Sequence, residues 1–228
     1  LKTVDFTRCK HLKEIGEEAF GYCEKLEEVD IPNSVKSIGM NAFEHCNSLK
    51  KVFLPASLEE IGEKAFSECE KLEEVDFSLS TQLKRIGDET FYRCKKLQNI
   101  VLPDSVTFIG QEAFVQCESL RLFVLPASLE KLEDNVFSNC EKLEEVDFSI
   151  STRLKRIGDN TFCNCKKLEK IILPVSLEEI GNGTFCGCEK LEEVDFSLST
   201  QLKRIGDKTF YYCKKLQNIV LPDSVTLI

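Results

Sequence analysis

Residues 49–69 read LKKVFLPASLEEIGEKAFSEC, and close variants of this stretch recur along the whole chain. The most regular part is the motif Phe-x-x-Cys-x-x-Leu, which occurs nine times with steps of 23 or 25 residues. A fixed period of this length predicts a solenoid, because each unit buries its apolar face only by stacking on its neighbours. The motif begins at Phe20, Phe43, Phe66, Phe91, Phe114, Phe137, Phe162, Phe185 and Phe210.

Each unit begins with a short alternation of apolar and charged residues. Val29 and Ile31 would point to one side of an extended chain, and Glu28 and Asp30 to the other. This Leu-x-x-Val-x-Ile pattern is typical of the strand of a leucine-rich repeat. The later Ala-Phe-x-x-Cys segment has helical spacing but is short, so it predicts a single 3₁₀ or α-helical turn on the convex side.

Three units carry two additional residues in the turn that follows the strand. These long turns run from Asp76 to Gly87, from Asp147 to Gly158 and from Asp195 to Gly206, where other units have a shorter Leu-Pro-x-Ser-Leu turn. Insertions in solenoids fall in loops, so we expect the units to stack without interruption through them.

Two blocks of the chain are nearly identical copies, residues 72–109 and residues 191–228, which differ at three positions. The array therefore grew by copying blocks of several units. Because the period is unbroken, we expect a single leucine-rich repeat domain over residues 1–228, with about nine to ten units of 23 or 25 residues. Neither end shows a polar capping unit, and we expect the chain to be a fragment of a longer array.

The repeated pattern resembles the BspA-like family of leucine-rich repeats, also called the Treponema pallidum type. Residues 49–69 follow the family pattern almost letter for letter, with local departures elsewhere such as Leu132-Glu133 in place of Ile-Gly. Periodicity and resemblance together predict an α/β solenoid, a leucine-rich repeat superhelix with a parallel β-sheet on the concave face and short helical turns on the convex face. The resemblance also implies a surface-exposed or secreted protein of host-associated bacteria or protists, active in adhesion to host proteins and in aggregation.

Composition narrows the possible partners. The chain is 42% hydrophobic and 30% charged, which is typical of a folded protein rather than a disordered one. Its net charge of −9 repels phosphate backbones and anionic lipids, so nucleic acid and membrane surfaces are disfavoured as partners. No apolar run is long enough for this segment to insert into a bilayer.

Nine of the twelve cysteines occupy the Phe-x-x-Cys positions: Cys23, Cys46, Cys69, Cys94, Cys117, Cys140, Cys165, Cys188 and Cys213. They predict an inward ladder of reduced thiols, because free cysteine behaves as a small buried hydrophobe. A disulfide framework is disfavoured, since each stacked thiol has two equivalent neighbours and their number is odd. Cys163 and Cys186 share one register beside the ladder and are expected to be exposed; a link between them remains open, as neighbouring rungs lie about 4.7–4.9 Å apart. Cys9 is expected to be a lone surface thiol.

The sequence carries no signature of an enzyme. It contains no Ser-His-Asp constellation, Gly-rich phosphate loop or metal-binding helix. Acidic pairs such as Glu27-Glu28 and Glu73-Glu74 recur with the repeat, whereas a catalytic carboxylate pair needs an individual environment that separates its two pKa values. We therefore expect no catalytic residues, no cofactor and no metal.

The outward side chains of the strands are the candidate binding site, because in this fold they line the concave face. Along this face, strands with acidic outward side chains alternate with strands whose outward side chains are apolar. Exposed apolar groups often mark interaction sites. The alternative is that β-branched and aromatic residues occur there because they favour strands in general. Apolar anchors with an acidic surround suit a partner with basic and apolar groups. The predicted protein-binding residues are Glu28, Asp30, Phe53, Glu74, Asp76, Val101, Leu122, Val124, Glu145, Asp147, Ile172, Glu193, Asp195 and Val220.

These observations predict a non-enzymatic protein-binding module that adheres to host or partner proteins at a cell surface. The alternative is an intracellular, cytoplasmic scaffold or assembly subunit with the same fold, because the reduced cysteine ladder is compatible with a reducing compartment. A carbohydrate receptor would need aromatic platforms on the concave face, where Phe53 alone qualifies. The oligomeric state is left open.

Overall fold

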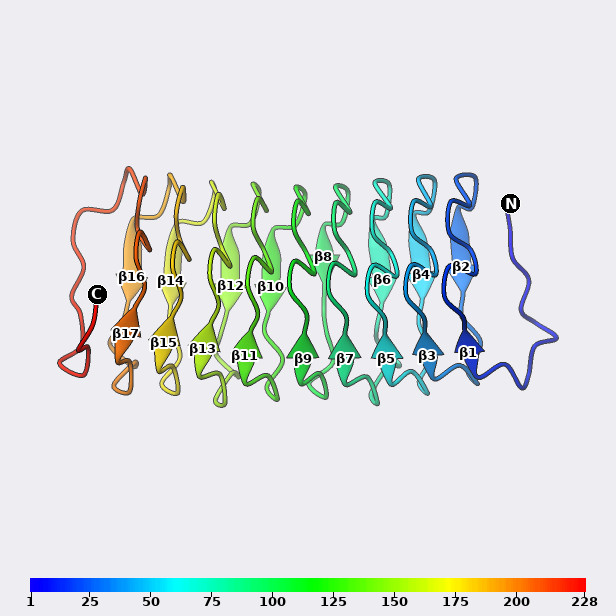
Figure 1. Ribbon diagram of the computed structural model, residues 1–228, viewed down its shortest axis with the longest axis horizontal. Helices are drawn as coiled ribbons and strands as arrows, with labels where there is room; N and C mark the ends of the chain where they lie inside the picture. The colour runs from blue at the N-terminus through cyan, green and yellow to red at the C-terminus, as the bar shows by residue number, and fades with distance from the viewer.

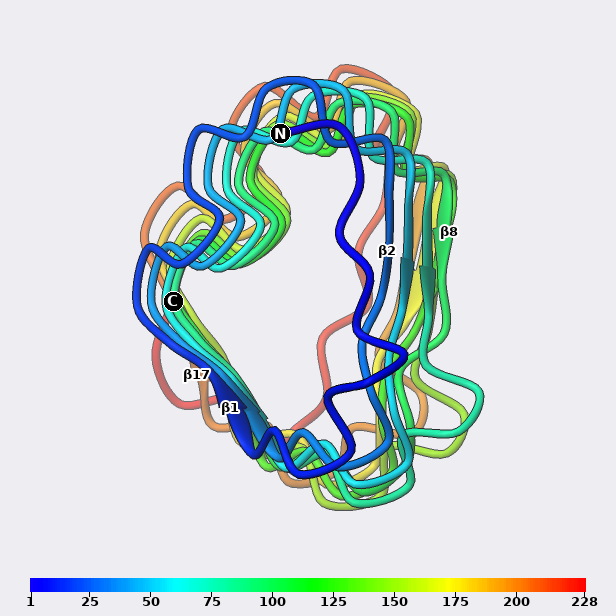
Figure 2. The same ribbon diagram turned by 90° about the vertical axis from the view of Figure 1, so that its right-hand side faces the viewer.

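Two columns of short parallel strands run along the chain in the computed structural model, which describes residues 1–228. The units stack side by side along one axis, with the two termini at opposite ends (Figure 1). Figure 2 shows that the two columns lie on different sides of the cross-section. The buried apolar side chains fill the space between them in one continuous cluster.

The first column consists of the strands that the apolar alternation predicts. Each strand of the second column ends at the isoleucine of an Ile-Gly step, or at Leu132 in β11, and these strands were not predicted from the sequence. The first column comprises β2 (Glu28–Asp30), β4 (Lys51–Phe53), β6 (Glu74–Asp76), β8 (Asn99–Ile100), β10 (Leu122–Val124), β12 (Glu145–Asp147), β14 (Lys170–Ile172) and β16 (Glu193–Asp195). The second comprises β1 (Glu14–Ile15), β3 (Ser37–Ile38), β5 (Glu60–Ile61), β7 (Arg85–Ile86), β9 (Phe108–Ile109), β11 (Lys131–Leu132), β13 (Arg156–Ile157), β15 (Glu179–Ile180) and β17 (Arg204–Ile205).

Most strands pair in parallel with the strand at the same place in the next unit, as Val29 pairs with Val52 and Val52 with Val75. The second column has one break, between β9 and β11. The first column forms three hydrogen-bonded groups, β2-β4-β6, β8-β10-β12 and β14-β16. Its breaks fall directly after β6 and β12, each of which leads into a long turn. The units therefore remain stacked through the long turns, as predicted, but the hydrogen bonding of this column is interrupted there.

The phenylalanines of the repeated motif form a stacked column in the core, which confirms their predicted burial. Successive ring centroids lie between 5.2 and 5.8 Å apart, with nearly parallel planes. All except the outermost two, Phe20 and Phe210, are completely buried. The strand leucines beside them, such as Leu120 and Leu143, are equally buried, so each unit completes its core only through its neighbours.

The prediction of helical turns on the convex face is wrong, because the chain contains no helix. In each unit two positions around the phenylalanine have positive φ; beside Phe43 these are Asn41 and His45, both at 55°. A left-handed residue every fourth position prevents a right-handed helical turn from continuing. The peptide groups bond to the next unit instead: the Phe43 N–H donates to the Ala65 carbonyl at 2.8 Å.

The residues with a left-handed backbone conformation lead to a prediction about stability. Asn135 has a φ of 58°, a conformation that asparagine and glycine tolerate but β-branched residues do not. We expect Asn135→Val to lower the free energy of unfolding by about 1–2 kcal/mol, and Asn135→Gly to leave it close to the parent value. Urea denaturation followed by circular dichroism measures both. Equal stability of the two variants would contradict this turn geometry.

Candidate protein-binding face

The outward side chains of the first strand column form one face, which we call the β2–β16 face. In each three-residue strand the middle side chain is buried and the outer two are exposed or half-buried. The predicted site residues therefore lie together in two rows along this face. Val101 and Val220 follow the same rows, although the assigned strand ends before Val101 and no strand is assigned around Val220.

An apolar block occupies the middle of the β2–β16 face. Val101 is 71% exposed and Leu122 is 41% exposed, while Val124 is half-buried. Phe53, predicted to be exposed together with them, is half-buried and separated from the block by the rung of Asp76, with which it is in register. We call Val101, Leu122 and Val124 the central apolar block.

The acidic rungs of this face differ in whether a lysine neutralises them. The Lys170 ammonium lies 2.8 Å from Glu193, and this hydrogen bond raises the pKa of Lys170. An equivalent pair joins β4 to β6. Glu145 and Asp147 on β12 form no ion pair. The strand that borders the central apolar block thus presents two carboxylates to solvent without a counter-charge.

The aspartates at the start of the long turns shape those turns. The Ser197 N–H donates to Asp195 Oδ1 at 2.8 Å, and the hydrogen bonds from the Ser197 backbone and side chain lower the pKa of Asp195. The same turn recurs after β6 and β12. In Figure 2 the loops that follow these strands protrude beyond the outline of the other units.

Each long turn carries an exposed apolar residue at its tip: Leu79, Ile150 and Leu198. The sequence-based site did not include these side chains. The available signal was an apolar residue between two serines in an otherwise polar turn, at the same place in three units.

Grooves open on this face wherever a long turn interrupts the sheet. The groove between β6 and β8 has a volume of about 660 Å³, and the one between β12 and β14 about 550 Å³. A third, of about 420 Å³, follows β16, and a fourth, of about 960 Å³, lies beside residues 4–10. The insertions therefore create grooves in a face that is otherwise regular.

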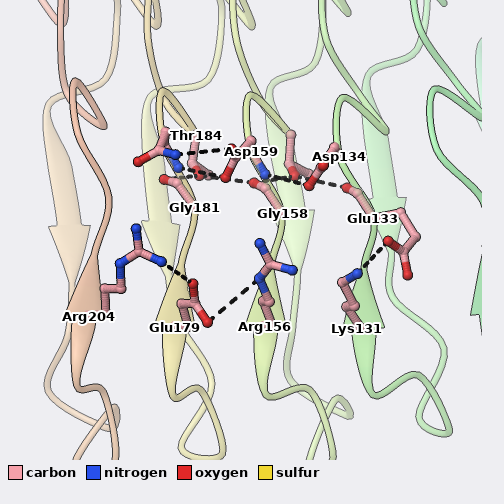
Figure 3. Close-up of polar contacts among 12 residues, drawn as sticks. Lys131, Glu133, Asp134, Arg156, Gly158, Asp159, Glu179, Gly181, Thr184 and Arg204 are labelled. Atoms are coloured by element: carbon pink, nitrogen blue, oxygen red, sulfur yellow. Dashed lines mark hydrogen bonds and ion pairs between the residues drawn. The ribbon is translucent and has the colours of Figure 1, made fainter.

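On the face of the second strand column, charged side chains of neighbouring strands form ion pairs with one another (Figure 3). The Arg204 guanidinium lies 2.7 Å from Glu179, which Arg156 approaches to 3.7 Å from the other side. Further along, the Arg85 guanidinium lies 3.9 Å above the ring centroid of Phe108. Such exposed pairs contribute little stability individually. They leave this face without a block of unpaired charge, so the β2–β16 face is the better candidate for binding.

The cysteine ladder lies in the core, as predicted. Each ladder thiol from Cys46 onward donates to the phenylalanine carbonyl of the preceding unit; Cys117 Sγ lies 3.3 Å from the Phe91 oxygen. Burial raises the pKa of Cys117 well above its usual value. All twelve cysteines are unpaired thiols.

The cysteines outside the ladder divide into two kinds. Cys9 is exposed, as predicted. Cys163 and Cys186 are half-buried, so the prediction that they are exposed is wrong. Their register faces the neighbouring unit, and the equivalent Val115 and Ser138 are buried. Burial, together with the nearby Cys186 thiol, raises the pKa of Cys163 to about 11.

Thiol labelling tests this arrangement. In the native protein we expect Cys9 to react rapidly with an aromatic disulfide reagent and the ladder thiols to react only on unfolding, because the thiolate is the reactive form and burial opposes it. In denaturant without reductant, all twelve cysteines should react. Recovery of the ladder cysteines mainly as disulfides would show that the fold is covalently cross-linked instead.

The structure contains no group of histidine, cysteine or acidic side chains arranged to hold a metal ion. It has no helix of the length and hydrophobicity that a membrane span needs. The recurring acidic pairs, such as Glu73-Glu74, are exposed side by side on the surface.

Comparison with known proteins finds the same repeat elsewhere. A family profile described as the BspA type leucine rich repeat region matches residues 13–144 and 144–228, in six copies. The leucine rich repeat protein of T. pallidum is 34% identical, with a TM-score of 0.64 over 69% of this chain and 72% of that one. A leucine-rich repeat protein from Bacteroides ovatus is 26% identical, with a TM-score of 0.60 over 94% and 71% of the two chains. A leucine rich cell surface protein from Faecalibacterium prausnitzii is 25% identical, with a TM-score of 0.50 over 95% and 73%. Among curated proteins, none matches this chain.

Proposed function

The chain belongs to the BspA-type leucine-rich repeat family, and from this premise we propose that it is a non-enzymatic module that binds a protein partner in adhesion at a cell surface. Repeat solenoids of this kind present extended surfaces suited to protein interactions. The observation that carries the proposal is the central apolar block, which lies beside the unpaired carboxylates of Glu145 and Asp147.

The chemistry of this surface defines the partner. Leu122 is in register with Glu145, and Val124 with Asp147, so each apolar side chain of β10 has an acidic neighbour on β12. Apolar groups at the centre of a contact supply most of the binding energy, while charges at the rim steer association. The matching partner surface presents an apolar patch bordered by lysine or arginine.

A location at the cell surface is supported by one structural neighbour, which is described as a leucine rich cell surface protein. The family resemblance points the same way, since it implies adhesion. The alternative, an intracellular scaffold, would use the same face. The reduced ladder does not favour it, because Cys94 and the other inner ladder thiols are completely buried and protected in either compartment. Antibody labelling of intact and permeabilised cells distinguishes the two locations.

The proposed binding face is tested with a double substitution. Leu122→Asp combined with Val124→Asp removes the apolar anchors and adds two charges at the centre of the contact, so we expect it to abolish partner binding. The partner is captured from surface-biotinylated host cells on the immobilised chain, identified by mass spectrometry, purified and measured by surface plasmon resonance. Circular dichroism checks that the variant folds.

A control variant, Ser37→Asp with Thr107→Asp, adds the same charge to the other side of the solenoid and should bind like the parent. Replacing Glu145 and Asp147 by lysine should mainly slow association and weaken its salt dependence. If the double aspartate variant of the central block binds as tightly as the parent, this face is not the binding site.

A further inference from the structure

The groove between β12 and β14 has an interrupted backbone, as the groove between β6 and β8 does, but it differs from that groove in its walls and its charge. Resting on the proposed function, we infer that it holds an extended peptide segment of the protein partner, which presents a basic and an apolar side chain two residues apart.

The backbone at this groove has unused hydrogen-bonding groups. Between bonded units the Glu192 N–H donates to the Glu169 carbonyl at 2.9 Å, and the Glu144 N–H donates to Arg121 at 2.8 Å. No such bond joins Glu169 to Glu144, and β12 does not pair with β14. Glu144 and Glu169 both belong to the lining of the groove. An extended segment can bond to them, as in recognition by added strands.

The walls of this groove are two long turns separated by a single unit with a short turn. The long turns that follow β12 and β16 begin at Asp147 and Asp195, whereas those at Asp76 and Asp147 are separated by two short-turn units. The volume of about 550 Å³ accordingly lies between Ser149 on one side and Leu198 on the other.

The width favours an extended chain over a helix. Two rungs of a parallel sheet span roughly 9–10 Å, and the wall side chains occupy part of that distance. An α-helix with its side chains is about 10–12 Å across and would be obstructed by the turns. A single extended strand fits between them.

The floor of the groove is apolar at one end. Ile172 is 46% exposed and Leu198 is 55% exposed, and both line the groove together with the exposed Val175. These side chains form a contact for one aliphatic or aromatic residue of the peptide.

The other part of the groove is acidic. Glu145 has no ion pair, and neither does Asp147, while the adjacent Lys170 is already bound to Glu193 at 2.8 Å. Lys170 and Ile172 stand on the same side of β14, two residues or about 6.5–7 Å apart. A peptide with arginine or lysine at one position and an apolar residue two positions away repeats this spacing on its own face, and places the cation beside the carboxylates of β12.

The test uses fluorescein-labelled nonapeptides of alternating serine and threonine that carry one arginine and one isoleucine two residues apart. Their binding to the full chain is followed by fluorescence anisotropy. We expect the arginine peptide to bind at least tenfold more tightly than its twin with glutamate in place of arginine. A third peptide with N-methylated backbone amides should also lose at least tenfold, because it cannot donate its main-chain hydrogen bonds.

The near-identical blocks supply a matched control. Leu198→Ser should weaken binding of the arginine peptide at least fivefold, whereas Leu79→Ser, in a turn of the same sequence, should change it less than twofold. Both side chains are exposed, so neither change threatens folding. Equal effects of the two variants, equal affinity for the arginine and glutamate peptides, or no binding of the arginine peptide would each overturn the inference.

The double aspartate variant of the central apolar block separates this inference from the proposed function. It should still bind the arginine peptide, because Leu122 and Val124 lie outside the groove. If the variant loses the partner but no peptide binds the parent chain, the proposed function stands and the groove assignment fails. If Leu198→Ser weakens peptide binding but the double aspartate variant binds the partner as tightly as the parent, the groove assignment is supported. The partner-binding site would then be centred on the groove and not on the central apolar block.

Discussion

Phe114→Ala should lower the free energy of unfolding by about 3–5 kcal/mol, the range for buried phenylalanines truncated in other cores. The ring of Phe114 is completely buried and stacks between Phe91 and Phe137, at centroid distances of 5.3 and 5.5 Å. Phe123 adds an edge contact at 5.4 Å. Truncation therefore opens a cavity and removes three aromatic contacts, and the rigid units on either side cannot collapse to fill it.

Urea denaturation followed by circular dichroism measures the loss. Phe53→Ala is the control, because this ring is half-buried at the surface of β4 and its truncation should cost less than about 1.5 kcal/mol. A loss below about 1 kcal/mol for Phe114→Ala would contradict the stacked phenylalanine column.

The stacked core could be predicted from the sequence because its cause is local and repeated. Every unit places phenylalanine, cysteine and leucine at the same offsets, so one period assigns the whole array. The strand rows follow from the alternation in segments such as 28–30, where the middle residue alone is apolar and buried.

The convex turns could not be predicted, because their apolar spacing fits two backbones. Phe43 and Cys46 are three residues apart, which suits a helical turn as well as the observed turn with left-handed residues. Residue type did not reveal the left-handed positions either. Some hold asparagine or glycine, such as Asn160 and Gly183, but others hold lysine or tyrosine, such as Lys64 and Tyr22. Bonding between units, rather than local preference, determines this conformation.

The candidate site could be predicted in outline but not in detail. The two outward rows follow from the strand pattern. Which carboxylates remain unpaired depends on neighbours in other units, since Lys170 pairs with Glu193 in the following unit and not with Glu145 in the preceding one. The grooves depend on the order of long and short turns, which can be seen in the spacing of 23 and 25 residues. They also depend on the loss of hydrogen bonds between strands after each long turn, which the sequence does not reveal.

Gly87→Ala is expected to destabilise the array by about 3 kcal/mol, at the upper end of the range for overpacked positions. The Gly87 N–H donates to the Ile61 carbonyl at 2.8 Å, which draws the two units together at this point. A Cβ on Gly87 would lie 2.5 Å from the Glu63 nitrogen, 2.6 Å from the Gly62 carbonyl carbon and 2.9 Å from the Glu63 Cα. All three are backbone atoms, so no side-chain rotation relieves the contact.

The same close approach recurs along the array: a Cβ on Gly158 would lie 2.7 Å from the Glu133 carbonyl carbon, and one on Gly181 would lie 2.6 Å from the Asp159 nitrogen. Figure 3 shows the polar contacts around these two glycines. There the Asp159 N–H donates to Asp134 Oδ1 at 2.9 Å, and the Thr184 hydroxyl donates to the Gly158 carbonyl at 3.1 Å. Beside Gly87, the Gln111 N–H makes the same kind of bond to Asp88 Oδ1 at 2.9 Å. A methyl group at Gly87 would therefore strain the hydrogen bonds between units as well as the local backbone.

Gly16→Ala is the matched control, because it stands in the same Ile-Gly step and its Cβ would meet no atom within 4 Å. We expect this variant to unfold at nearly the parent urea concentration, while Gly87→Ala unfolds at a clearly lower one. If the two glycine variants were equally stable, the glycine would serve only the local turn. A loss confined to Gly87→Ala would show that glycine recurs after isoleucine because consecutive units approach too closely there for a Cβ, with the unit that holds Glu133 at this position as the exception.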